Sequence, residues 1–308
     1  MLNMIWRAGC MVLILGLFAA WPIRVAGEED PGETLQGKFS DAACTAAFHA
    51  LPKGASPFDP SVAEALLNYD TSCFKNWNGL RENSRLHLAT TVGTLFGPDG
   101  NPFCTATRIK SNVIMTAAHC KMNRTVFRLF GYPDTPLKVK SQILKGSETI
   151  LDLSDYALWE IEDNKLPFDG LPIRRDFSPH QAITIVAVSQ VPFYLTLNAD
   201  ASHWLDAVRW SPTRSAQIWP PSEVVPPIPR GSRAAECIFH KMPTFPGMSG
   251  APIIGVLKPR ETGGKPELFV AGIHLRDGTA SVRAAGCGVR GEYNVGIRVP
   301  APILEFSK

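Results

Sequence analysis

Three short segments of the chain hold the residue types of a hydrolase that uses a serine nucleophile. His119 follows an apolar run, Asp155 opens a second apolar segment, and Ser249 lies in a glycine-flanked turn. A serine hydroxyl is a poor nucleophile at neutral pH, so it needs a base within hydrogen-bonding distance, and the base needs an orienting carboxylate. We therefore predict that Ser249 attacks a carbonyl group, that His119 takes its proton, and that Asp155 fixes the tautomer of the imidazole.

The turn around Ser249 also predicts a site for the negative charge that this attack creates. Gly247 lets the chain turn sharply, and Gly250 permits close approach behind the serine. Backbone amides in a tight turn can donate hydrogen bonds to an oxyanion. We expect the N–H groups of Gly247 and Ser249 to be these donors.

Short runs of β-prone residues predict the scaffold that positions these side chains. From residue 86 onward such runs alternate with turn signals, of which the segment 97–100 is the clearest. The first set comprises residues 88–96, 103–109, 113–116, 126–130, 137–143 and 156–161. The second set comprises residues 182–188, 207–210, 251–256, 268–274 and 293–299, with a proline-rich loop at 219–229 and a terminal helix at 302–306. Many short strands at even spacing favour closed antiparallel barrels.

The first 85 residues have a different character. Arg7, the apolar residues 11–20 and the small residues 25–27 are typical of an export signal over residues 1–27. The apolar run is shorter than the ~20 residues of a spanning helix, so we expect no membrane association after cleavage, with an uncleaved anchor as the alternative. Residues 28–85 form an N-terminal extension with short helices expected at 41–50 and 61–69. This extension is either a propeptide or cap over the catalytic unit, or a segment packed on its back.

Charge and histidine spacing exclude other classes of protein. The net charge is +3, with no run of lysine and arginine and no interleaving of basic and aromatic residues, so no nucleic-acid partner is expected. The remaining histidines show no metal-ligand spacing, and the chemistry above needs no cofactor. We expect neither a metal nor a cofactor.

The cysteine count indicates disulfides. Of the seven cysteines, Cys10 falls in the expected signal, which leaves six in an exported chain. Six cysteines allow fifteen pairings. Chain order favours three pairs, which are Cys44–Cys73, Cys104–Cys120 and Cys237–Cys287.

These motifs together resemble the chymotrypsin/trypsin family of serine proteases, in a bacterial-type member. The segment 104–120 looks like the histidine motif, 155–158 the aspartate strand, and 247–252 the nucleophile turn. The segment 271–274 is similar to the strand that walls the specificity pocket, and 294–298 to the last strand of bacterial members.

The resemblance covers about residues 86–306 and implies an all-β fold of two packed six-stranded antiparallel barrels. His119 and Asp155 would come from the first barrel, residues 86–170, and Ser249 from the second, residues 171–308. It also implies that the Cys104–Cys120 bridge holds the histidine loop. The expected protein is then a monomeric serine endopeptidase, secreted or periplasmic, that acts on polypeptides.

Several positions depart from the family pattern. Met248 stands where trypsin-like zymogens carry an aspartate that receives a new N-terminus, so activation through that ion pair is not expected. Pro243 stands where trypsin has its pocket aspartate, so specificity for arginine or lysine has no support there. Leu275 replaces a serine that touches the catalytic aspartate, and Asp277 replaces a glycine at the pocket rim.

Two pocket positions indicate a different preference. Thr244 and His274 fall where bacterial glutamyl endopeptidases carry a threonine and a histidine that bind an acidic side chain. A protonated histidine with a hydroxyl is a reasonable receptor for a carboxylate. The alternative is that His274 is simply packed in its strand.

Two rival functions remain open. One is a catalytically silent, protease-like binding or adhesion protein, and the other is a latent protease whose residues 28–80 block the cleft. Labelling by a fluorophosphonate separates a silent protein from an enzyme.

Overall fold

The structure is a computed structural model of the 308-residue chain. It describes residues 41–52, 59–80, 82–121, 125–146, 153–162, 165–178, 180–190, 201–211, 217–221, 223–224, 234–257, 267–276, 287 and 293–307. The expected export signal, Asp277 and most of the proline-rich loop lie outside these residues. Among the helices within the described ranges, none is long and apolar enough to span a membrane.

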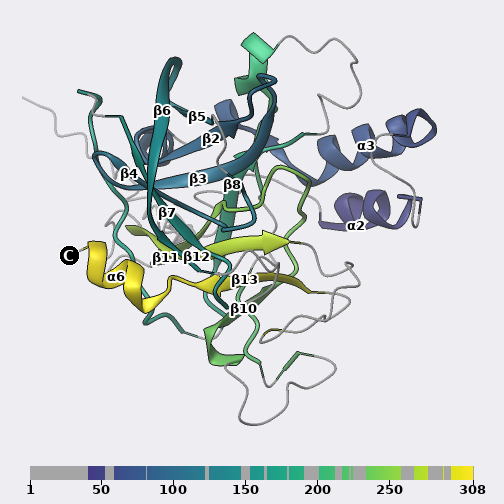
Figure 1. Ribbon diagram of the computed structural model, residues 1–308. Coiled ribbons are helices and arrows are strands. Elements are labelled where there is room, and N and C mark those ends of the chain that lie inside the picture. Colours follow the sequence, from purple (N-terminus) through teal and green to yellow (C-terminus); the bar gives the residue numbers. More distant parts are fainter. Residues whose placement is uncertain are drawn as a thin grey trace, which may run out of the picture.

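A closed six-stranded barrel forms the first half of the fold (Figure 1). Its strand order is β2-β3-β4-β7-β6-β5, and every pairing is antiparallel. The strands are β2 (Val92–Phe96), β3 (Pro102–Lys110), β4 (Val113–Thr116), β5 (Val126–Leu129), β6 (Tyr132–Lys145) and β7 (Ala157–Ile161). Strands β2 and β4 are buried along their whole length, because they lie between the barrel core and the second half of the protein.

The second half is a seven-stranded antiparallel sheet of order β1-β9-β8-β11-β12-β13-β10. Its strands are β1 (Lys75–Asn76), β8 (Ile183–Val188), β9 (Val208–Trp210), β10 (Cys237–His240), β11 (Pro252–Leu257), β12 (Glu267–Arg276) and β13 (Asn294–Arg298). Isolated bridges join Trp219 to Phe239 in β10 and Gln217 to Ala182 just before β8. The segment 217–219 thus completes a ring of six with β8, β11, β12, β13 and β10. The expected fold of two packed β-barrels is confirmed.

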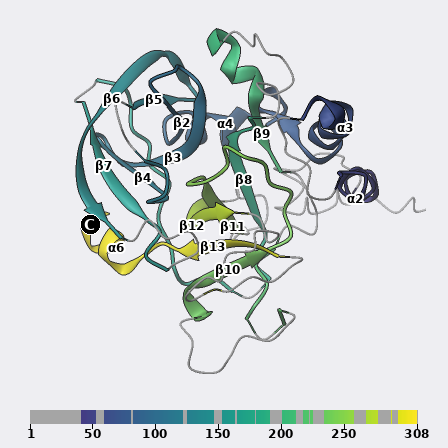
Figure 2. The same cartoon turned by 45° about the vertical axis from the view of Figure 1, so that its right-hand side comes forward.

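The two halves share one apolar core. A single buried cluster includes Leu95 and Met115 from the first barrel together with Phe239 and Ile273 from the second. The terminal helix α6 (Ala301–Ser307) follows β13 back to the first barrel, where Ile303 is fully buried in the same cluster (Figures 1 and 2). The barrels are therefore fixed relative to each other by burial as well as by the chain.

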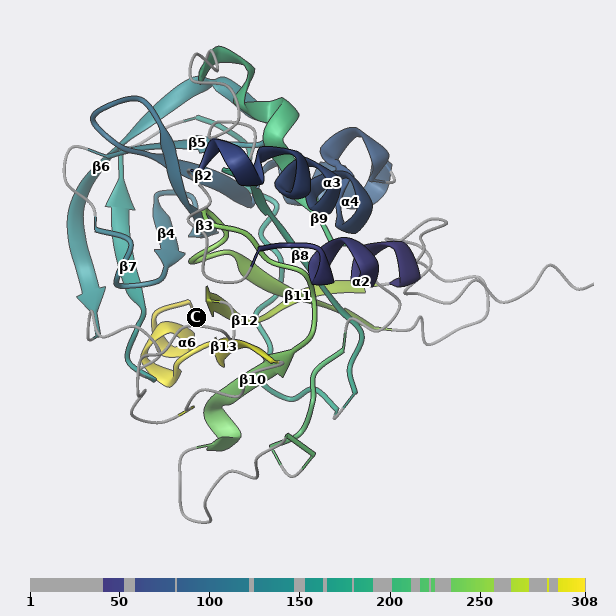
Figure 3. The same cartoon turned by 90° about the vertical axis from the view of Figure 1, so that its right-hand side faces the viewer.

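A helical hairpin precedes the barrels and lies on the flank of the second sheet (Figures 2 and 3). It consists of α2 (Asp41–His49), the 3-10 turn η1 (Pro60–Val62) and α3 (Ala63–Cys73), and the disulfide Cys44–Cys73 joins the helices. Strand β1 follows the hairpin and pairs with β9. The two helices expected from sequence are confirmed, and α3 is longer than predicted.

Three expectations about secondary structure need correction. The strand expected from residue 88 begins only at Val92, because Glu82–Ala89 forms the helix α4. Leu86 and Leu88 have strand-like alternation, but Leu86 is exposed on α4 and Leu88 is buried in the same apolar cluster as Trp77. Strand β10 was not predicted, and Trp219 pairs with it instead of lying in a surface loop.

All three disulfides favoured by chain order are present.

Candidate active site

The first barrel holds His119 and Asp155 in direct contact. His119 lies in the turn after β4, next to the Cys104–Cys120 disulfide, and Asp155 lies just before β7, which pairs with β4. The ring Nδ1 of His119 lies 2.7 Å from Asp155 Oδ2, and the backbone N–H of His119 donates to Asp155 Oδ1 at 3.0 Å. Both carboxylate oxygens therefore face the same histidine.

The two side chains differ in burial, and this bears on which ring nitrogen of His119 carries the proton. The side chain of Asp155 is fully buried, whereas that of His119 is 17% exposed. A buried carboxylate requires hydrogen-bond partners, and an ionised one can only accept. Asp155 therefore holds the proton of a neutral His119 on Nδ1, which leaves Nε2 as a base.

The second barrel supplies the turn 245–251 that carries Ser249. Gly247 has a φ of +94° and Gly250 a φ of +81°, backbone conformations in the left-handed region that side chains with a Cβ rarely adopt. A Cβ on Gly250 would lie 2.0 Å from Thr116 Oγ1. The turn therefore touches the first barrel directly.

Thr105 of β3 joins the first barrel to this turn at two points. Its backbone N–H donates to the carbonyl of Ser249 at 2.9 Å, and its Oγ1 donates to the carbonyl of Gly247 at 3.1 Å. Thr116 Oγ1 in turn donates to the Thr105 carbonyl at 2.8 Å. The position of the Ser249 backbone thus depends on the barrel that carries His119.

The carbonyl groups of residues 246–249 in this turn are all engaged. Those of Gly247 and Ser249 accept from Thr105, that of Pro246 accepts from the Gln190 amide at 3.2 Å, and that of Met248 accepts from the Ala251 amide at 3.0 Å.

The amides of the turn alternate between bonded and unbonded. Met248 N–H donates to Phe245 and Gly250 N–H donates to His274. Within the described part of the chain, no acceptor is found for the N–H groups of Gly247 and Ser249. The carbonyls of Pro246 and Met248 hold the two peptide planes that carry these N–H groups, which are left as donors.

The hydroxyl of Ser249 has a different partner from the one predicted. Its Oγ donates to the carbonyl of Leu275 at 3.2 Å. Within the described residues, no hydrogen bond joins this Oγ to His119. Cys120, the next residue after His119, has its Sγ 3.7 Å from the carbonyl of Ser249, so the two backbone segments are adjacent.

The predicted pocket residues have buried surroundings. His274 lies in β12 with 1% of its surface exposed, and its ring Nδ1 is 3.3 Å from Nε2 of His240 in β10. Burial, with a smaller contribution from His274, lowers the pKa of His240 well below its ordinary value. Thr244 is half-buried, and its carbonyl accepts a long 3.5 Å bond from the Tyr69 hydroxyl.

Sequence reasoning missed Thr105 and Gln190. Threonine and glutamine occur in strands for many reasons, and their role here follows from which carbonyl they reach. From the sequence, His240 is expected at the surface, with a place in the pocket lining as the alternative, and the surface position is wrong because its side chain is fully buried.

One cluster has a metal-like residue set. Sulfur atoms of Cys104 and Cys120 and a ring nitrogen of His119 lie within 4.8 Å of one another. Both sulfurs are oxidised in a disulfide, so they cannot act as thiolate ligands.

No protein-family model and no curated protein matches the sequence. Solved structures match it with low identity. Neuropsin, a serine protease expressed in the limbic system of mouse brain, matches with a TM-score of 0.49 and 14% identity, over 72% of this chain and 96% of that chain. Kallikrein-related peptidase 10 in complex with Zn²⁺ matches with a TM-score of 0.45 and 14% identity, over 71% of this chain and 93% of that chain. These likenesses concern the course of the chain alone.

Proposed function

We propose that the protein is a serine endopeptidase that hydrolyses peptide bonds through Ser249, His119 and Asp155. The observation that carries the proposal is the buried carboxylate of Asp155, which contacts both the backbone N–H and the ring Nδ1 of His119. Such a carboxylate fixes the backbone and the ring of His119 together, which is the arrangement that orients an imidazole for proton transfer.

The reaction proceeds through an acyl-enzyme. His119 Nε2 takes the proton of Ser249 as Oγ bonds to the substrate carbonyl carbon, and the oxyanion receives hydrogen bonds from the N–H groups of Gly247 and Ser249. The C–N bond then breaks, and the proton passes from His119 to the leaving amine. Water next attacks the ester and gives its proton to His119, which returns it to Ser249 as the acid product leaves.

This reaction requires the Ser249 hydroxyl to leave the carbonyl of Leu275. A change of one side-chain torsion redirects Oγ, and exchanging one neutral hydrogen bond for another costs little. Hydrogen bonds of a catalytic site are often completed only when substrate is bound.

A fluorophosphonate probe tests the proposal without knowledge of the substrate. We expect it to label the wild-type protein and the Ser141→Ala variant, in which an exposed serine is changed, but not Ser249→Ala. Labelling that persists in Ser249→Ala would reject Ser249 as the nucleophile. Failure to label the wild-type protein would favour the silent binding protein.

We also propose an acidic residue at the substrate position before the cleaved bond. Support comes from the buried pair of His274 and His240 beside the loop of Thr244, since a substrate carboxylate would supply the negative charge that a protonated histidine needs. Profiling of cleavage sites on a peptide library tests this preference. Cleavage after large apolar or basic residues would show that His274 is only packed.

Export of the protein is part of the proposal. Three disulfides are expected to persist in an oxidising compartment, outside the cytosol. Fractionation of the producing cells and N-terminal sequencing of the mature protein test both export and cleavage near residue 27.

A further inference from the structure

The helical hairpin contacts the loop that leads into Ser249. The ring of Tyr69 in α3 lies 4.6 Å from the ring of Phe245 at 82°, and the ring of Phe74 lies 4.6 Å from it in a stacked arrangement. Tyr69 and Phe74 also contact each other edge to face at 5.8 Å. The three rings are almost completely buried in one apolar cluster. Phe245 is therefore packed from two sides by the hairpin.

Phe245 transmits this packing to the nucleophile turn through its backbone. Its carbonyl accepts from the Met248 amide at 3.2 Å, and its own amide donates to Met248 Sδ at 3.3 Å. Met248 is buried and immediately precedes Ser249. A shift of the Phe245 ring thus moves the peptide that carries the N–H of Ser249.

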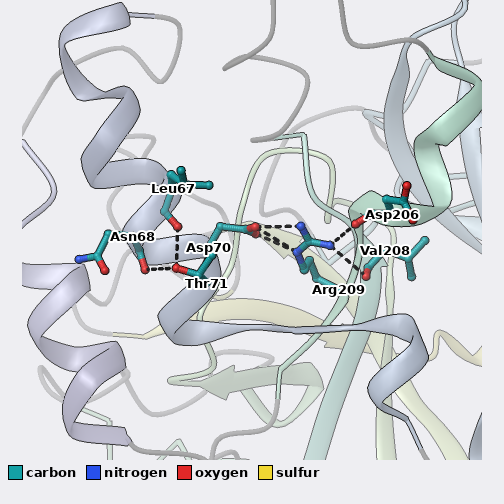
Figure 4. A network of polar contacts seen from close by, with 7 residues as sticks. All are labelled: Leu67, Asn68, Asp70, Thr71, Asp206, Val208 and Arg209. Atoms are coloured by element: carbon teal, nitrogen blue, oxygen red, sulfur yellow. Dashed lines mark hydrogen bonds and ion pairs between the residues drawn. The ribbon is translucent and has the colours of Figure 1, made fainter.

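The hairpin is itself fixed to the second sheet. Figure 4 shows Asp70 of α3 facing Arg209 of β9, with Oδ2 of Asp70 2.9 Å from Nη2 and 3.1 Å from Nε of the guanidinium. Both side chains are buried, so removal of either would leave an uncompensated charge. Strand β1 adds backbone pairing to β9, and Trp210 Nε1 donates to the carbonyl of Asn76 at 3.2 Å. The helix that carries Tyr69 is therefore tied to the second sheet by a buried ion pair, and the segment after Phe74 by backbone pairing.

The described residues of the hairpin make no polar or ring contact with the catalytic side chains. No hydrogen bond, ion pair or ring contact joins the described residues of 41–80 to His119, Asp155 or Ser249. Near the nucleophile, the hairpin contacts Phe245 and Thr244, which precede Ser249 in the chain.

We propose that Tyr69 and Phe74 are positioning residues that hold the turn 245–249 in its reactive geometry. The hairpin is then a permanent part of the active protein and not a propeptide that must be removed. Met248 stands where trypsin-like zymogens carry an aspartate that pairs with a new N-terminus, so the turn cannot be supported by that ion pair. The hairpin provides a different support for the same turn. This inference rests on the proposed function.

The test compares two variants of α3 that differ in what they contact. Tyr69→Leu removes the ring that packs on Phe245, whereas Leu66→Ala removes buried surface elsewhere in the same hairpin. Tyr69→Phe keeps the ring and serves as the conservative rescue. Each variant is assayed at a temperature where near-ultraviolet circular dichroism shows it to be fully folded.

Two readouts follow from the proposal. The rate constant of fluorophosphonate labelling should fall roughly 10- to 100-fold in Tyr69→Leu and stay close to wild type in Tyr69→Phe and Leu66→Ala. Amide hydrogen exchange at Met248 and Gly250 should accelerate in Tyr69→Leu alone. An equal loss of rate and protection in Leu66→Ala, or none in Tyr69→Leu, would overturn the proposal.

Exchange also separates this proposal from the proposed function. If the wild-type protein is not labelled, the proposed hydrolase fails, and the catalytic role of Tyr69 fails with it. Unchanged exchange in Tyr69→Leu beside normal labelling of the wild type instead rejects the positioning role alone.

Discussion

Replacement of Gly250 by alanine tests the contact between the nucleophile turn and the first barrel. The new methyl group would lie 2.0 Å from Thr116 Oγ1 and 2.4 Å from the carbonyl oxygen of Thr105, with the turn at a φ of +81°. The left-handed backbone costs about 1–2 kcal/mol for a residue with a Cβ. Relief of the overlap requires the barrels to separate locally, and overpacking of this kind adds about 1–3 kcal/mol.

Gly100 offers a matched control. Its φ is +80°, but a Cβ there would meet nothing within 4 Å. Urea unfolding should therefore show a loss of about 2–5 kcal/mol for Gly250→Ala and of only about 1–2 kcal/mol for Gly100→Ala. Fluorophosphonate labelling should slow only in Gly250→Ala, because only that turn carries Ser249. Equal effects of the two substitutions on both measurements would refute the idea that the first barrel supports the turn.

Three further predictions concern other contacts. Asp155→Asn should lower the rate of fluorophosphonate labelling on the order of 10⁴-fold, because an amide side chain cannot accept from both donors of His119. Asp169→Asn, in the exposed pair with His87, should leave the rate unchanged, and equal rates for the two variants would contradict this. Because the pKa of His240 is lowered in the folded protein, the unfolded chain binds an extra proton below about pH 6.5. Between pH 7.5 and 5.5, the free energy of unfolding in urea should therefore fall by about 1 kcal/mol more in the wild type than in His240→Phe, and parallel losses would reject this. Replacement of both Cys44 and Cys73 by alanine should lower the free energy of unfolding by about 3–4 kcal/mol, because the disulfide closes a loop with a separation of 29 residues. Urea titration measures this change, and an unchanged midpoint would disprove it.

The sequence was sufficient to predict that His119 and Asp155 pair in the first barrel. A histidine beside a cysteine and an aspartate before an apolar strand are local patterns. Strand β4 precedes His119, strand β7 follows Asp155, and the two strands are neighbours in the barrel. The disulfides were also predictable, since each joins two cysteines that are consecutive in the chain from Cys44 onward.

Contacts between distant segments could not be predicted in the same way. Thr105 and Ser249 are 144 positions apart, and nothing in the composition of β3 marks the threonine that reaches the turn. The helix α4 was missed because Leu86 and Leu88 alternate as in a strand, while tertiary packing buries only Leu88. The four residues of β10 were missed because the strand is short, although Ile238 and Phe239 are β-prone and pair with β13.

Strand β1 has a consequence for the solubility of shortened forms of the protein. It covers the outer side of β9, which would otherwise be the open border of the second sheet. An open border exposes unpaired amides and carbonyls that recruit strands from other molecules. A form that starts after Asn76 should therefore self-associate even if each barrel still folds.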